Sequence, residues 1–131
     1  MPRACVAAII EREGNILLTK RNVPPYKGSW VIPGGKIDEN EEAAAAAKRE
    51  AKEETNIDIE PRFLFYHDEF TPEVANGFSK HYLVLVFHAE TAQEAKINSE
   101  STEFTWVTPE DALKMDLGFR HSDIIKRWLA L

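Results

Sequence analysis

The sequence contains a single cysteine, Cys5, and it has no long apolar run. One cysteine cannot form an internal disulfide or an all-cysteine zinc site, which is typical of a protein in a reducing compartment. No segment approaches the roughly 18 uninterrupted apolar residues of a membrane-spanning helix. The apolar run at 4–10 ends at charged residues and is too short for a signal peptide. We therefore expect a cytoplasmic protein with no membrane partner.

Positive charge is also scarce. The chain has 16 lysines and arginines against 22 aspartates and glutamates, a formal net charge of −6. Such a balance disfavours tracking of a phosphate backbone, so we expect no nucleic acid polymer as a partner, and any phosphate binding should require a metal ion. The length of 131 residues and the 44% hydrophobic content predict a single domain over residues 1–131.

Apolar runs rich in β-branched and aromatic residues predict the strands of the fold. The run at 80–90 is apolar on both faces, so we place it in the interior of a sheet. Helices are predicted at 41–55, after Pro109 with Thr108 as the N-cap, and from about His121 to the end. The other predicted strands are 4–10, 16–19 and 104–107, and the segments 30–32, 57–59 and 62–70 are expected to be extended.

The segment 41–55 is the most secure helix. It lacks glycine and proline, and its five consecutive alanines stand among lysine, arginine and glutamate, all strong helix formers. Asn40 suits the N-cap, and Glu41 and Glu42 would then occupy the first turn at the positive end of the helix dipole. Asn56 suits the left-handed residue that ends a helix.

Glu50, Glu53 and Glu54 lie at positions i, i+3 and i+4 of this helix, so their carboxylates share one face. A hard divalent cation such as Mg²⁺ would offset their mutual repulsion, and Arg49 can pair with a carboxylate and orient it. An isolated glutamate trio is more often a solvated helix face. Here the glycine pair at 34–35 predicts a hinged loop that lets the backbone approach a ligand, which favours a site.

The spacing of these residues closely resembles the signature of the Nudix hydrolases. Gly35 is followed after five residues by Glu41 and after seven more by residues 49–57, REAKEETNI. A chance match of the six required residues is on the order of 10⁻⁷ per start position. Ala51 replaces a larger aliphatic residue and Asn56 replaces glycine, and these departures concern local packing rather than a charged group.

The resemblance implies an α/β fold, an α/β/α sandwich around a mixed β-sheet. It also implies hydrolysis of a diphosphate linkage in a nucleoside diphosphate attached to another group. Glu50, Glu53, Glu54 and the carbonyl of Gly34 would bind Mg²⁺, or alternatively Mn²⁺, and Arg49 would orient the carboxylates. The metal ion would polarise a phosphoryl oxygen while a carboxylate accepts the proton of the attacking water.

The identity of the general base stays open. In many family members another acidic residue comes from the loop before the late tryptophan strand. Glu100, six residues before Trp106, is the candidate here, and Glu103 is its rival. Glu53 is the third residue that could take the proton.

Specificity in such a scaffold depends on loop residues that stack on a base or pair with phosphate. The substrate-binding candidates are Arg21, Trp30, Lys36, Phe78 and His81. Each of these residue types is more often core or surface than a ligand contact, so the sequence says little about the substrate.

Two substrate classes compete. Pro72 lies fifteen residues after Ile57, which resembles the ADP-ribose-hydrolysing members of the family. The compact length and the approach at 28–36 resemble MutT-type members that act on nucleoside triphosphates or modified nucleotides. We favour triphosphates, with ADP-ribose or another nucleotide sugar as the alternative. A non-catalytic nucleotide sensor is disfavoured because all of the signature carboxylates are present.

The four histidines, His67, His81, His88 and His121, are dispersed. No two have the spacing of metal ligands on one helix turn, so we do not expect a zinc site. Members of the resembled family are often dimers, so a homodimer is a candidate partner state that the sequence alone does not decide.

Overall fold

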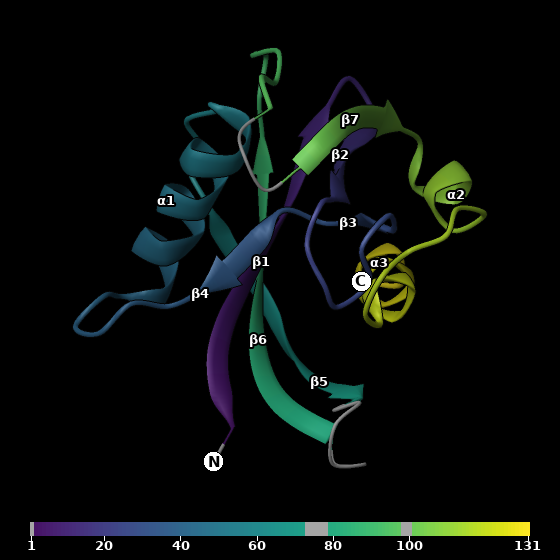
Figure 1. Ribbon diagram of the computed structural model, residues 1–131. Helices are drawn as coiled ribbons and strands as arrows, with labels where there is room; N and C mark the ends of the chain where they lie inside the picture. The colour runs from purple at the N-terminus through teal and green to yellow at the C-terminus, as the bar shows by residue number, and fades with distance from the viewer. Residues whose placement is uncertain (1, 73–78, 98–100) are drawn as a thin grey trace.

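The computed structural model describes residues 2–72, 79–97 and 101–131, and it places helices on both faces of a mixed sheet (Figure 1). The helices are α1 (Ala43–Thr55), α2 (Pro109–Ala112) and α3 (His121–Leu129). None of the helices in this part of the chain is long and apolar enough to cross a membrane. The strands are β1 (Arg3–Arg12), β2 (Asn15–Arg21), β3 (Trp30–Val31), β4 (Gly34–Lys36), β5 (Arg62–Pro72), β6 (Ser79–Glu90) and β7 (Ser101–Val107).

The sheet is organised around β1 and β6. Its main strand order is β3-β2-β1-β6-β5, while β4 also pairs with β1 and β7 with β2. β1 and β6 run parallel, in register from Arg3 opposite Tyr82 to Glu11 opposite Glu90, and the other strand pairs are antiparallel. The interior position predicted for the run at 80–90 is confirmed, because β6 has a neighbour on each side.

Alternate residues of β1 face two different helices. Val6 packs in a cluster with Ala46 and Ala47 of α1, whose small side chains let that helix lie close to the sheet. On the opposite face, Ile9 belongs to a cluster with Ile124 and Ile125 of α3. Figure 1 shows α1 and α3 on opposite sides of the strands. The predicted α/β/α sandwich is confirmed.

The start of α1 differs from the prediction. The helix begins at Ala43 with Glu42 as the N-cap, and its first turn contains no acidic residue. Asn40 instead adopts a left-handed backbone conformation with φ 62°. Glu41 lies outside the helix because its carboxylate is held by Arg49 and by the backbone N–H of Asp38. The predicted helix end is confirmed, since Asn56 is left-handed and its N–H bonds the carbonyl of Lys52.

The glycine pair is not a hinged loop but part of β4, antiparallel to β1. A Cβ atom on Gly34 would overlap the backbone carbonyl of Val6, and one on Gly35 would overlap the carboxylate of Glu50. Both glycines are therefore required by close approach, one to a strand and the other to a side chain of α1.

Candidate active site

Arg49 of α1 is the centre of a network of carboxylates. Its Nε and Nη2 atoms donate to the two carboxylate oxygens of Glu41 at 2.8 and 2.9 Å. Its Nη1 donates to Glu50 at 2.9 Å and to Glu53 at 3.2 Å, and Nη2 also reaches the carbonyl of Lys36 at 3.0 Å. A planar guanidinium can serve several acceptors at once in this way. One arginine thus connects β4, the loop after it and two carboxylates of the helix.

The network fixes the charge of its members. The hydrogen bond from Arg49, followed by the backbone N–H of Asp38, lowers the pKa of Glu41 to about 2. The same bond with Glu41 raises the pKa of Arg49 above its ordinary value. Both groups therefore stay ionised over the physiological pH range, and the ion pair can act as a permanent support for Glu50.

The two glycines of β4 position the other carboxylates. The Gly34 N–H donates to Glu54 at 3.1 Å, which ties the end of that side chain to the sheet. The absence of a Cβ atom at Gly35 makes room for the Glu50 carboxylate, whose side chain is only 14% exposed. Glu53 is more open, with 57% of its side chain exposed. The local sequence thus holds two carboxylates against β4 and leaves the third accessible.

These residues suit a hard cation. Glu50, Glu53 and Glu54 offer carboxylate oxygens from one helix face, the donor type that Mg²⁺ and Mn²⁺ prefer, and the missing Cβ at Gly35 lets the Glu50 carboxylate lie against β4. Their ligand atoms do not form a closed group, because Arg49 lies between Glu50 and Glu53. The arrangement fits a cation whose coordination shell is completed by water molecules and by a phosphate ligand.

A cavity of about 380 Å³ opens beside this helix. Among the predicted site residues, Gly34, Glu54, Arg21 and Lys36 line it. Cys5 lines it as well, and burial raises the pKa of that thiol to about 11, so it stays protonated and is a poor nucleophile. The cavity joins the Glu54 carboxylate of α1 to cationic side chains from β2 and β4.

The other predicted residues lie elsewhere. Trp30 is on β3 beneath Lys20, whose Nζ atom lies 5.7 Å from the ring, and His81 bonds Asp68 at 2.9 Å. Neither of them lines the cavity. Glu103 pairs with Lys20 at 3.3 Å, while Glu100 and Phe78 lie outside the described residues.

The sequence did not point to two buried titratable residues of the cavity. Glu69 of β5 and His121 of α3 are buried, and both line the cavity. His121 accepts a hydrogen bond at Nδ1 from the Ile32 N–H at 3.0 Å, and burial lowers its pKa to about 4. The available signal for Glu69 was the period-two alternation of β5, which places it on the same face as Phe65. For His121, its position in the first turn of a helix gave no such signal.

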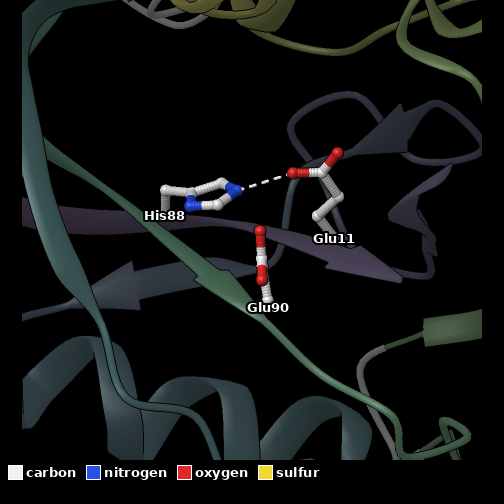
Figure 2. Close-up of side chains that lie close together, drawn as sticks. All are labelled: Glu11, His88 and Glu90. Atoms are coloured by element: carbon white, nitrogen blue, oxygen red, sulfur yellow. Dashed lines mark hydrogen bonds and ion pairs between the residues drawn. The ribbon is translucent and has the colours of Figure 1, made fainter. Parts of the chain in front are cut away.

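A second cluster lies on β1 and β6, away from α1. Ligand atoms of Glu11, His88 and Glu90 all lie within 4.8 Å of one another (Figure 2). His88 Nε2 is 2.8 Å from a carboxylate oxygen of Glu11, and its ring stacks on Trp128. The sequence has no local pattern for this grouping, because the parallel pairing of β1 and β6 brings together residues far apart in the chain.

The geometry agrees with the result of comparison with known families. The NUDIX domain model matches residues 1–128. The chain belongs to the Nudix family. Nudix enzymes generally use divalent metals, in keeping with the acidic face of α1.

The relatives agree with this assignment. This Nudix chain is 34% identical to the nucleoside triphosphatase NudI of Escherichia coli K12 over 127 residues. That alignment covers 88% of each protein. It is 39% identical over 90 residues to the low-salt glycan biosynthesis protein Agl8 of Haloferax volcanii, covering 66% of this chain and 58% of that protein. Among solved structures, the MutT NUDIX hydrolase from Burkholderia pseudomallei has a TM-score of 0.74 and 32% identity, covering 84% of this chain and 85% of that one. The chain is therefore a pyrophosphohydrolase of the Nudix family.

Proposed function

We propose that this Nudix enzyme hydrolyses a nucleoside triphosphate or a modified nucleotide in a reaction that depends on Mg²⁺, with Mn²⁺ as a substitute. The observation that carries the proposal is the Arg49 network, which presents Glu50 and Glu53 on one helix face beside the cavity. The relationship to a nucleoside triphosphatase supports the choice of substrate class.

Glu50, Glu53, Glu54 and the Gly34 carbonyl would hold the divalent cation. When bound, the cation supplies polarisation of a phosphoryl oxygen and neutralises developing negative charge. Arg49 keeps the carboxylates of Glu50 and Glu53 in position through its bonds of 2.9 and 3.2 Å. Positioning of this kind lowers the cost of reaching the transition state.

Glu53 is our choice for the group that accepts the proton of the attacking water at a carboxylate oxygen. Its side chain is 57% exposed, so water can reach it, whereas Glu50 is only 14% exposed. Glu103 is a weaker candidate since its carboxylate pairs with Lys20. Glu100, outside the described residues, stays a prediction.

Arg21 and Lys36 would contact the substrate, because both are cationic and line the cavity, and Lys36 on β4 is the one placed to meet the phosphates. The Arg21 guanidinium also bonds the Pro25 carbonyl at 2.8 Å and lies 5.1 Å from the ring of Phe119. Substrate contacts of Trp30, Phe78 and His81 stay predictions. ADP-ribose or another nucleotide sugar is the alternative substrate class.

The test measures release of phosphate and pyrophosphate from nucleoside triphosphates, ADP-ribose and nucleotide sugars in the presence of Mg²⁺. The substitution Glu53→Gln should lower kcat more than 100-fold with an unchanged circular dichroism spectrum, because it removes a proton acceptor and an anionic metal ligand. Glu60→Gln is the matched control, since the Glu60 side chain is 94% exposed and pairs only with Lys48 among the described residues. Near-normal turnover of the Glu53 variant would remove that residue from the chemistry, and no turnover of any compound would favour a nucleotide sensor.

Four further expectations belong to this proposal. We expect residues 1–131 to act as one domain and to work in the reducing cytoplasm, where the single Cys5 stays a thiol. A homodimer stays a prediction, and light scattering after size exclusion would decide it. We expect a small nucleotide as the partner rather than a nucleic acid polymer.

A further inference from the structure

The buried carboxylate of Glu69 stands out at the cavity wall. Glu69 is 3% exposed and lies on β5, on the face of the sheet that packs against α3. Its Oε1 atom accepts a hydrogen bond from the Arg120 backbone N–H at 2.7 Å and lies 3.4 Å from Nε2 of His67. Its Oε2 atom is buried and has no hydrogen-bond partner within residues 2–72, 79–97 and 101–131. It is the only such side-chain atom in those ranges.

An unsatisfied buried oxygen of this kind is costly, and native structures contain few of them. His121 does not stabilise this oxygen as a cation. Burial lowers the pKa of the His121 imidazole to about 4, so the ring is neutral at physiological pH. The Nδ1 atom of His121 accepts the Ile32 N–H, so the neutral ring carries its proton on Nε2. The carboxylate oxygen therefore needs a donor from outside the described chain.

The surroundings of Glu69 fit a flat heteroaromatic ring. Phe119 and His121 line the same cavity and stack on each other with ring centroids 5.3 Å apart. The Phe119 ring already meets His121 and the Arg21 guanidinium, so a base would stack on the outer face of His121, a contact that does not choose among bases. A hydrogen-bonding group at the edge of the ring must then supply the choice.

Glu69 also lies at the far end of the cavity from the metal-binding helix. Gly34, which binds Glu54, is on β4, and β1 and β6 separate that strand from β5. Three strand spacings amount to roughly 14 Å across the sheet. A nucleotide can span such a distance with its phosphates near α1 and its base near Glu69.

We propose that Oε2 of Glu69 accepts a hydrogen bond from the exocyclic amino group of the substrate base, so that the enzyme prefers amino bases, cytosine or adenine, to keto bases. This inference rests on the proposed function, since it assigns the base end of the same substrate. A keto oxygen in that place would face the carboxylate oxygen without a proton between them. Guanine binds a carboxylate most strongly through its two adjacent donors, and Oε1, which would accept one of them, is already bonded to Arg120.

The test compares bases that differ at one exocyclic group. Calorimetry measures Kd for CMP against UMP and for AMP against inosine monophosphate, with the wild type, Glu69→Gln and Glu60→Gln. We expect the wild type and the Glu60 control to bind the amino member of each pair about 10- to 100-fold more tightly, the range for one hydrogen bond to a charged group. Glu69→Gln should bring both ratios close to one, because an amide can turn to accept from an amino group or donate to a keto group.

The outcomes separate the two proposals. A wild-type ratio near one, or an unchanged ratio in Glu69→Gln with a native thermal melt, would overturn the role of Glu69. Equal loss of turnover on all triphosphates with unchanged binding ratios would also overturn it, by placing Glu69 in the chemical step. A further result is that the binding ratios fall to about one in Glu69→Gln, as expected, while no triphosphate is hydrolysed by the wild type. That result would support the role of Glu69 in base selection and contradict the proposed reaction.

Discussion

Replacing Gly35 with alanine should lower activity strongly while lowering the free energy of unfolding only a little. The new Cβ atom would lie 2.5 and 2.6 Å from the two carboxylate oxygens of Glu50, whereas ordinary contact begins at 3.4 Å. The carboxylate must therefore shift by about 1 Å. Glu50 is the end of a flexible side chain, so the shift is feasible, but it pulls against the 2.9 Å bond from Arg49.

A displacement of about 1 Å in a positioned group can cost on the order of 100-fold in rate. We expect Gly35→Ala to lower kcat by about that factor and to weaken Mn²⁺ binding, measured by product release and by calorimetry. The cost in free energy of unfolding should stay at about 1–3 kcal/mol, the usual range for overpacking.

Gly34→Ala is the informative comparison. Its Cβ atom would overlap the backbone carbonyl of Val6, which cannot rotate away while β4 stays paired with β1. That variant should lose stability first, seen as a large fall in the urea midpoint. If Gly35→Ala kept kcat within threefold and bound Mn²⁺ normally, the assignment of Glu50 as a metal ligand would be refuted.

Three other outcomes are expected. Arg49→Lys should lower kcat by about 100-fold, since an ammonium cannot hold Glu41 in two bonds while it also reaches Glu50 and Glu53; Lys52→Arg, an exposed exchange on the same helix, is the control. A chelator should abolish turnover and added Mg²⁺ should restore it, and activity that survives the chelator would contradict the metal assignment. Folding lowers the pKa of His121 from 6.5 to about 4. The buried neutral imidazole therefore contributes its full stabilisation of the fold above pH 6.5, and this stabilisation is lost as the pH falls towards 4. Urea unfolding should show a loss of up to about 3 kcal/mol across that window, and His121→Asn should lack this component.

The helix that carries the acidic site could be predicted from the sequence, because helix-forming residues and the i, i+3, i+4 spacing of Glu50, Glu53 and Glu54 are local properties. The left-handed Asn56 at its end was predictable for the same reason. The start of the helix was not. Glu41 is a good residue for a first turn, but Arg49 holds its carboxylate outside the helix, and such a contact outweighs a weak local preference.

The sequence by itself determined the family, the acidic helix and the sheet with helices on both faces, since hydrophobic patterns and motif spacing are written along the chain. Only the tertiary structure decided why both glycines of β4 are needed, which side chains line the cavity, and that Glu69 has an unpaired oxygen there. These features depend on β1 pairing in parallel with β6, a strand about 80 residues later in the chain. Contacts between residues so distant in sequence leave no local pattern. The chemistry of α1 could therefore be predicted from the sequence, because it depends on local spacing, whereas the environment of the base could not.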